Sequence, residues 1–287
     1  MAEAFAADWL DLREPADAVS RDAALAEALV AVLPQRPTLV DLGAGTGSLF
    51  RWLAPRIGGP QAWLLVDADA ALVERAFDTI AGRAVQVGLK VTAPNKRVLL
   101  VHTPLGAWRV EGRIADLADT PDRLPLERAD AVVCSALLDL VSRPWLEDLA
   151  DVLEVPFYAA LNVDGRDRFL PPHPADGIVA RGFRRDQARD KGFDGTALGA
   201  EATRFAAAAF RDRGFAVATA PSPWQLGPGQ AALVAALAAG HAAAAGQRLP
   251  GRRAAIRAWH RARALQAAQG RLRATIGHRD LLALPPG

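Results

Sequence analysis

The stretch TLVDLGAGTG, residues 38–47, determines how the rest of the sequence is interpreted. Apolar residues lead through Asp41 into three glycines, and TGSLFRWLA then has the spacing of a helix. The pattern predicts a buried strand, a tight glycine turn and a helix start. Glycines in such a turn permit positive φ and a close approach of a ligand to the main chain. The following helix offers unpaired N–H groups, so the turn is the first candidate binding site.

On the carboxyl side of this turn, strands and helices alternate. Residues 62–69, 129–138 and 155–163 are apolar runs typical of buried strands, and helical patterns follow the first two. A hairpin is predicted around Pro104-Leu105-Gly106. The alternation predicts a doubly wound α/β fold, with a mostly parallel sheet and helices on both faces.

The outer parts of the chain are helical or irregular. Helices are predicted over 4–12 and 20–33, separated by Pro15. Residues 164–196 are rich in Gly, Pro, Arg and Asp and predict a long loop of the kind that is functional or mobile. Strands are expected at 214–224 and 271–284, with a mostly helical insertion over 226–270 that breaks near Pro250-Gly251.

Composition narrows the class of protein. The chain has 287 residues, of which 51% are hydrophobic, and a formal net charge of +2. One cysteine, Cys134, cannot form an internal disulfide, and the five histidines lack ligand spacing, so no metal site is predicted. The N-terminus lacks a basic segment followed by an apolar one. The longest apolar run, 231–246, is short for a membrane span, and a cytoplasmic protein is expected.

Two cofactors compete for the glycine turn. A dinucleotide fingerprint needs G-x-G-x-x-G, but Ser48 stands where the third glycine belongs, and Gly47 comes one residue early. Asp41 would also place negative charge near a pyrophosphate. S-adenosylmethionine carries a sulfonium and an amino group and no phosphate, so a carboxylate beside the turn suits it.

At this point the chain resembles the class I S-adenosylmethionine-dependent methyltransferases, whose first motif VDLGAGTG matches closely. The resemblance covers roughly residues 36–165 and the last strands. It implies a Rossmann-like methyltransferase fold with seven strands, the last one antiparallel. We expect one methyltransferase domain over 1–287, with an N-terminal helical segment (1–34), a core sheet (36–225 and 271–287) and the helical insertion (226–270).

The resemblance also implies which residues contact S-adenosylmethionine. Asp67, at the end of the second strand, would hold the ribose hydroxyls, with Asp69 as the substitute if the strand ends later. Taken alone, an aspartate such as Asp67 is more often a helix N-cap, and its position relative to the glycines favours the cofactor contact. Asp116 would contact the adenine amino group. The full set of expected cofactor contacts is Asp41, Gly43, Ala44, Gly45, Gly47, Asp67, Ala68, Asp116, Leu117, Ser135, Ala136 and Leu137.

The methyl acceptor is less well specified. A general base is needed only if the acceptor keeps a proton, and the candidates are Asp139, after the fourth strand, and His173, in the long loop. Candidate substrate residues are Trp9, Arg13, Lys191 and Trp224. The near-neutral charge favours a small-molecule acceptor.

Three alternatives remain open. Residues 251–273 carry seven arginines and no acid, which suits an RNA methyltransferase; the simpler interpretation is a solvated helix packed through Ile256, Trp259 and Leu265. A non-catalytic protein that keeps the cofactor fold is the second alternative. An NAD(P)-dependent oxidoreductase is the third, and the glycine spacing disfavours it. The oligomeric state is not predicted.

Overall fold

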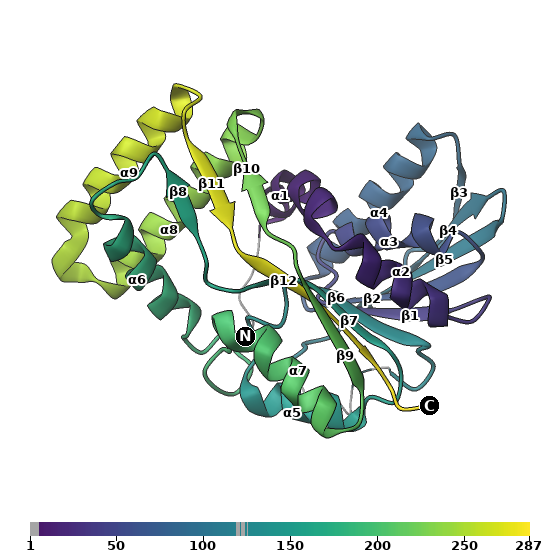
Figure 1. The fold of residues 1–287 in the computed structure, drawn as a ribbon. Coiled ribbons are helices and arrows are strands. Elements are labelled where there is room, and N and C mark those ends of the chain that lie inside the picture. Colours follow the sequence, from purple (N-terminus) through teal and green to yellow (C-terminus); the bar gives the residue numbers. More distant parts are fainter. Residues whose placement is uncertain (1–5, 119–120, 122–123, 125) are drawn as a thin grey trace.

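The central element of the computed structural model is a nine-stranded sheet. The structure describes residues 6–118, 121, 124 and 126–287. The strands of this sheet are β1 (Thr38–Leu42), β2 (Gln61–Asp67), β3 (Lys90–Asn95), β4 (Val98–Thr103), β5 (Gly106–Ile114), β6 (Ala131–Ser135), β7 (Phe157–Val163), β9 (Ala216–Pro221) and β12 (His278–Leu284). Their order is β3-β4-β5-β2-β1-β6-β7-β12-β9 (Figure 1).

The directions of the strands confirm the predicted fold. Strands β5, β2, β1, β6 and β7 run parallel, and β12 is antiparallel to both of its neighbours. The predicted number of seven strands is wrong, because β3 and β4 extend one edge as antiparallel strands. The hairpin between β4 and β5 is confirmed. Strand β3 is largely exposed, so it lacks the apolar alternation by which a strand is recognised.

Helices cover both faces of the sheet. The helices α2 (Ala23–Val32), α3 (Ser48–Ile57) and α4 (Ala70–Gln86) share one hydrophobic core with the sheet. The helices α5 (Arg143–Val152) and α7 (Ala202–Asp212) share a second hydrophobic core with the sheet. The short turn η2 (Gly199–Glu201) directly precedes α7. Strands β6 and β7 are buried on both faces, which accounts for their continuous apolar runs.

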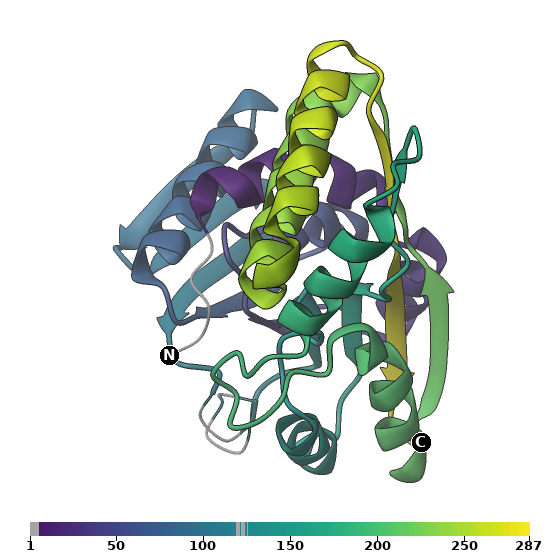
Figure 2. The same ribbon diagram turned by 90° about the vertical axis from the view of Figure 1, so that its left-hand side faces the viewer.

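A smaller sheet and three helices form a second layer beside the central sheet. The strands are β8 (Arg168–Leu170), β10 (Trp224–Leu226) and β11 (Arg273–Ile276), in the order β10-β11-β8. The helices are α6 (Asp176–Gln187), α8 (Ala231–Arg248) and α9 (Arg253–Ala268), with turns η3 (Pro228–Gln230) and η4 (Pro250–Arg252). Figure 2 shows α6, α8 and α9 lying side by side. They pack around a third core that contains Phe169 and Trp259.

Three expectations about this region need correction. The long loop predicted over 164–196 contains β8 and α6. The strands predicted at 214–224 and 271–284 each divide in two, because the chain passes there from the central sheet to the smaller one. The helical insertion and its break at Pro250 are confirmed. Ile256 and Trp259 are buried as expected, whereas Leu265 is 58% exposed.

The N-terminal helices also differ from the prediction. Helix α1 (Ala7–Ser20) continues through Pro15, which was expected to separate two helices; residues 4 and 5 of the predicted first helix lie outside the described residues. A proline inside a helix costs about 3 kcal/mol because the carbonyl four residues earlier loses its partner. Buried polar contacts of Glu14 and Asp17 on either side of Pro15 offset that cost.

The segment Pro228–Arg248 is long and apolar enough to cross a membrane, judged by length and composition alone. In the structure 39% of its apolar window is buried. Helix α8 packs against α6 and α9, with Leu233, Val234 and Leu237 facing the third core. One face of the helix is therefore buried in that core.

Close packing of α6 on α8 depends on Gly182, and we expect Gly182→Ala to destabilise the protein. An added Cβ would meet the Cα and Cβ of Ala245 at 2.6 Å, and overpacking of this kind costs about 1–3 kcal/mol. Gly177→Ala, in the same helix with nothing within 4 Å of its added Cβ, is the control. Thermal unfolding should show a lower Tm for the first variant and an unchanged or higher Tm for the second. Equal Tm values would contradict this account of the packing.

Candidate cofactor and acceptor sites

A cavity of about 490 Å³ opens at the carboxyl ends of the parallel strands. The chain passes from β1 to β2 on one side of β1, whereas β6 lies on the other side. The cavity therefore lies at the point where the strand order reverses. The structure brings nine of the predicted cofactor residues to this cavity: Gly43, Gly45, Asp67, Ala68, Asp116, Leu117, Ser135, Ala136 and Leu137.

The glycine turn adopts the strained backbone that its sequence predicts. Gly43, Gly45 and Gly47 have φ values of 67°, 53° and 78°. A Cβ on Gly45 would lie 3.0 Å from Leu10 of α1, and the Gly45 N–H donates to Asp67 Oδ2 at 2.8 Å. The turn therefore needs glycine both for its conformation and for the close approach of α1.

Asp67 is placed as the end of the second strand requires. Its Oδ1 accepts from the Asp69 N–H at 3.0 Å, and both oxygens have further lone pairs beside the cavity. Burial raises the pKa of this carboxyl. The helix N-cap of α4 is Asp69, whose Oδ1 accepts from the Ala71 N–H at 2.8 Å. The alternative in which Asp67 caps the helix is therefore wrong.

Asp41 lies in a narrow extension of the cavity, about 50 Å³ in volume, with Thr46 and Ser48. It is 1% exposed, and neither carboxylate oxygen has a hydrogen-bond partner among the described residues. Burial raises the pKa of Asp41 to about 8, and the nearby Arg21 guanidinium opposes that rise. A buried, unpartnered carboxyl of this kind is costly unless a ligand supplies a donor.

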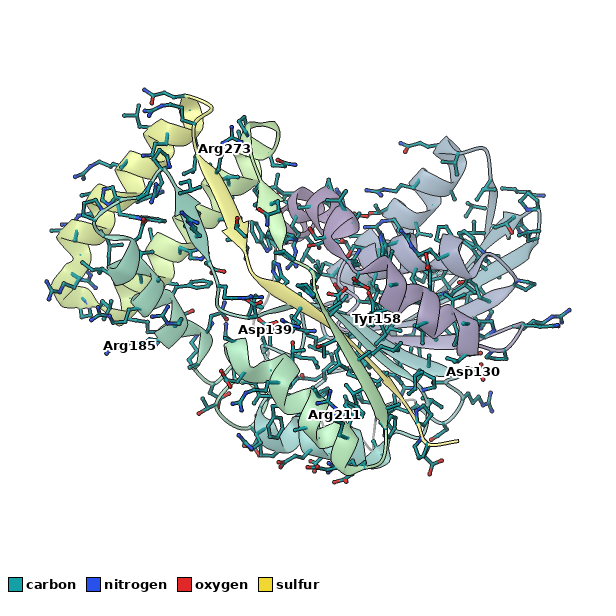
Figure 3. The ribbon with its side chains drawn as sticks, viewed as in Figure 1. Asp130, Asp139, Tyr158, Arg185, Arg211 and Arg273 are labelled. Carbon is teal, nitrogen blue, oxygen red and sulfur yellow. The ribbon has the colours of Figure 1, made fainter. Side chains whose placement is uncertain are left out.

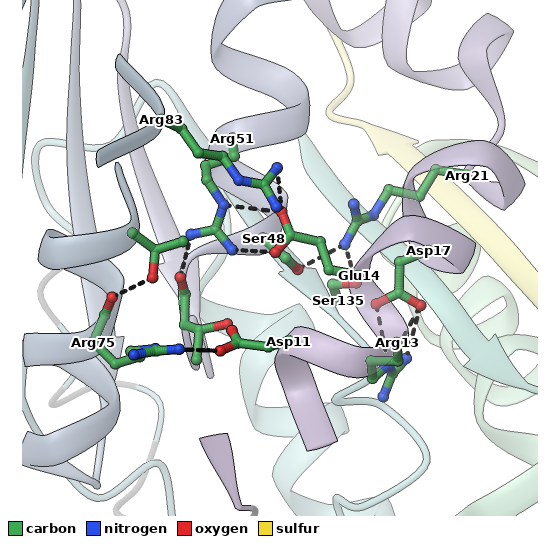
Figure 4. Close-up of polar contacts among 12 residues, drawn as sticks. Asp11, Arg13, Glu14, Asp17, Arg21, Ser48, Arg51, Arg75, Arg83 and Ser135 are labelled. Atoms are coloured by element: carbon green, nitrogen blue, oxygen red, sulfur yellow. Dashed lines mark hydrogen bonds and ion pairs between the residues drawn. The ribbon is translucent and has the colours of Figure 1, made fainter. Parts of the chain in front are cut away.

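Arg21 is a candidate site residue that the sequence did not reveal. Its Nη2 donates to Ser48 Oγ at 3.0 Å and to Ser135 Oγ at 3.2 Å (Figure 4). Nε and Nη1 are buried without a partner in the described part of the chain. Arg21 therefore places a guanidinium directly behind Ser48 and Ser135, which line the cavities, and near the Asp41 carboxyl. No motif marks Arg21, which follows α1 in a short link between helices.

Helix α1 is held over the cavity by ion pairs. Glu14, 4% exposed, accepts from Arg51 of α3 at 2.5 Å and from Arg83 of α4 at 3.1 Å (Figure 4). Asp11 pairs with Arg75 of α4 at 2.6 Å. These contacts place Leu10 and Arg13 in the cavity wall.

A second cavity, of about 320 Å³, adjoins the first and shares Arg13, Ala136, Leu140 and Lys191 with it. It lies between α1, the central sheet and the insertion. All four predicted substrate residues line it: Trp9, Arg13, Lys191 and Trp224. Asp139, one of the two candidate bases, lines it as well.

His173, the other candidate base, is not brought to either cavity. Its ring Nδ1 accepts from the backbone N–H of Ala175 at 3.1 Å, and its backbone N–H donates to Asp176 Oδ2 at 2.7 Å. It thus arranges the start of α6. A metal is not indicated either: in the described part of the chain, no group of three or more His, Cys, Asp or Glu residues is placed to hold one.

Asp41→Asn should remove a pH-dependent loss of stability from the free protein. The pKa of Asp41 is raised from 3.8 to about 8, so between these values the folded protein keeps a proton that the unfolded chain releases. Native stability therefore falls as the pH rises through this range and levels off above it. Thermal unfolding should show the Tm of the variant, relative to the native protein, increasing from pH 4 to pH 8. A difference that is constant with pH would contradict the assignment.

Among known proteins, the chain resembles solved structures in fold and has no match in sequence. No protein-family model and no curated protein matches the sequence. Among solved structures, an S-adenosylmethionine-dependent methyltransferase from Geobacter sulfurreducens is 14% identical with a TM-score of 0.47, and the match covers 100% of both chains. Geranyl diphosphate C-methyltransferase from Streptomyces coelicolor A3(2) is 14% identical with a TM-score of 0.42, over 92% of this chain and 78% of that one.

At these identities and TM-scores the matches carry no weight for function, and the assignment of the fold depends on this chain's own topology. Five parallel strands, an antiparallel β12 inserted beside β9, and a glycine turn after β1 agree with the expectation drawn from the first motif. The chain has the Rossmann-like fold of the class I methyltransferases.

Proposed function

We propose that this protein is an S-adenosylmethionine-dependent methyltransferase that acts on a small molecule in the cytoplasm. The observation that carries the proposal is the buried, unpartnered Asp41 beside the glycine turn, in the narrow extension of the cavity that Asp67 lines. A cationic amino group would donate to that carboxyl and favour its ionised form, whereas a phosphate has no positive charge to stabilise that form.

Each end of the cavity suits a different part of this cofactor. Asp41 would receive the amino group and Arg21 the carboxylate of the methionine portion, as a charge-assisted pair on each side. Asp67 would accept from the ribose hydroxyls. Leu72, Leu117 and Leu137 provide apolar walls for the adenine, and Asp116 lies beside them to accept from its amino group.

The bound cofactor would supply an activated methyl group, and this chain would supply orientation. The second cavity shares part of its wall with the first, so an acceptor held there would lie against the cofactor cavity. Fixing two reactants in that geometry accounts for much of the acceleration that such a transfer needs. The second cavity has a volume of about 320 Å³, which fits a small molecule and lies at the lower end of the ~300–1,000 Å³ range of ligand sites.

The alternatives receive less support. A dinucleotide would place its pyrophosphate next to Asp41. The arginine-rich segment is only partly available to RNA, because Arg263 is fully buried and pairs with Asp176. A non-catalytic binding protein would have the same cofactor contacts and no turnover.

Calorimetric titration with S-adenosylmethionine and S-adenosylhomocysteine tests the proposal. We expect binding of both ligands, and Asp67→Asn should weaken it at least tenfold, about 1.4 kcal/mol, because an amide accepts with only one of its two terminal atoms. Asp69→Asn is the control, since asparagine also caps helices well and Asp69 caps α4.

The absence of binding by the native protein would contradict the proposal, and NAD(P) titrated in parallel separates the oxidoreductase alternative. An equal loss of affinity in Asp67→Asn and Asp69→Asn would mean that the conformation of the loop between β2 and α4, and not the Asp67 carboxylate, determines binding.

A further inference from the structure

The second cavity contains an unusual set of buried polar atoms. Four side-chain atoms in its lining are buried with no hydrogen-bond partner among the residues that the structure describes: Asp139 Oδ1, Asp167 Oδ1, Gln187 Oε1 and His278 Nδ1. Asp139 and His278 are 6% and 2% exposed. Groups left unsatisfied in this way cost free energy unless a ligand pairs with them.

Three of the four atoms are acceptors: the oxygens of Asp139, Asp167 and Gln187. His278 is neutral at physiological pH, because burial, with the nearby Arg13, lowers its pKa to about 4, so its ring has one donor and one acceptor nitrogen. The unsatisfied groups of the cavity are therefore mostly acceptors.

Arg13 and His241, which also line this cavity, are engaged by the chain's own acceptors. Arg13 donates to Asp17 at 3.0 Å and lies over the Trp224 ring. His241 has Leu237 O at 2.8 Å from Nδ1 and Asp167 Oδ2 at 2.9 Å from Nε2, and it stacks on Phe183. An acidic ligand would have to compete for these groups.

Asp139 lies in the segment of chain that the two cavities share. It comes three residues after Ala136 and directly before Leu140, both of which line the two cavities. Ala136 has a φ of 55°, a left-handed backbone that is costly for alanine and is found where function requires it. Figure 3 shows Asp139 where the insertion meets the central sheet.

We propose that the second cavity binds an acceptor rich in hydrogen-bond donors, an amine or alcohol with a compact apolar body, and that Asp139 takes the proton from the nitrogen or oxygen that is methylated. The apolar body would contact Trp9, Trp224 and Phe183. This inference depends on the proposed methyltransferase function.

The step balances in atoms and charge. The acceptor nitrogen or oxygen forms a bond to the methyl carbon while the carbon–sulfur bond breaks, and the sulfur keeps that electron pair and becomes a neutral thioether. The proton of the acceptor passes to the Asp139 carboxylate. Burial raises the pKa of Asp139 and so makes it a stronger base, while its own backbone N–H, Lys191 and Arg13 oppose the rise.

A fragment screen on the protein saturated with S-adenosylhomocysteine tests the class of acceptor. Ligand-observed NMR compares three sets of single-ring fragments: amines and alcohols, carboxylic acids, and ethers or hydrocarbons without donors. We expect the first set to bind preferentially. Gly240→Leu should abolish that binding, because Gly240 lines the cavity and has nothing within 4 Å of an added Cβ.

Gly246→Leu is the matched control, in the same helix, with equally open space at its Cβ and no place in the lining. Preference for carboxylic acids or donor-free rings, no preference, or binding that survives Gly240→Leu would overturn the inference. Failure of S-adenosylhomocysteine itself to bind would be seen before the screen and would contradict the proposed function instead.

The role of Asp139 is tested on any bound amine or alcohol that the native protein methylates, with the product followed by mass spectrometry. Asp139→Asn should lower kcat by about 100-fold, the effect typical of a lost general base, with a much smaller change in KM. An unchanged kcat, or a change confined to KM, would remove Asp139 from this role. So would a native protein that methylates none of the amines and alcohols it binds.

Discussion

The turn that follows β1 is the constraint on which both cavities depend. Its three left-handed glycines let the Gly45 N–H reach the carboxylate of Asp67 at the end of β2. This hydrogen bond ties together the ends of two neighbouring strands at the edge of the sheet. With side chains in place of the glycines, the turn would be strained and would clash with α1. The open space at the carboxyl ends of the strands exists because the backbone can make this turn.

Helix α1 converts that open edge into an enclosed site. Glu14 and Arg51 are nearly fully buried, and breaking such a pair leaves an uncompensated buried charge at a cost of about 3–5 kcal/mol. The pair therefore specifies where α1 lies, and Leu10 and Arg13 come into the cavity wall with it. The same helix contributes to the walls of both the first and the second cavity.

The insertion provides the remaining wall. Strands β11 and β12 follow one another directly, so one run of chain passes from the central sheet to the smaller sheet, and α8 is brought over the end of the central sheet. The contact of Gly182 with Ala245 lets α6 and α8 approach closely. His241 on α8 then reaches Asp167, and the acidic and imidazole side chains gather around one cavity.

Local patterns in the sequence were sufficient for most of the fold and part of the site. Apolar runs and glycine spacing predicted the parallel sheet, the turn and Asp67, because strand periodicity and turn chemistry act over a few neighbouring residues. The prediction failed for β3, whose exposed residues carry no such pattern, and for α1, where tertiary contacts outweigh Pro15.

Local sequence patterns suffice to predict the central α/β sheet and the residues at the carboxyl ends of its strands. The position of Arg21 near Asp41, the separation of His173 from both cavities, and the shared cavity of Asp139, Asp167 and His278 become evident only in the folded chain. These groups come from distant parts of the chain. Their burial and charge environment depend on how α1, the sheet and the insertion pack, and no local pattern encodes that packing.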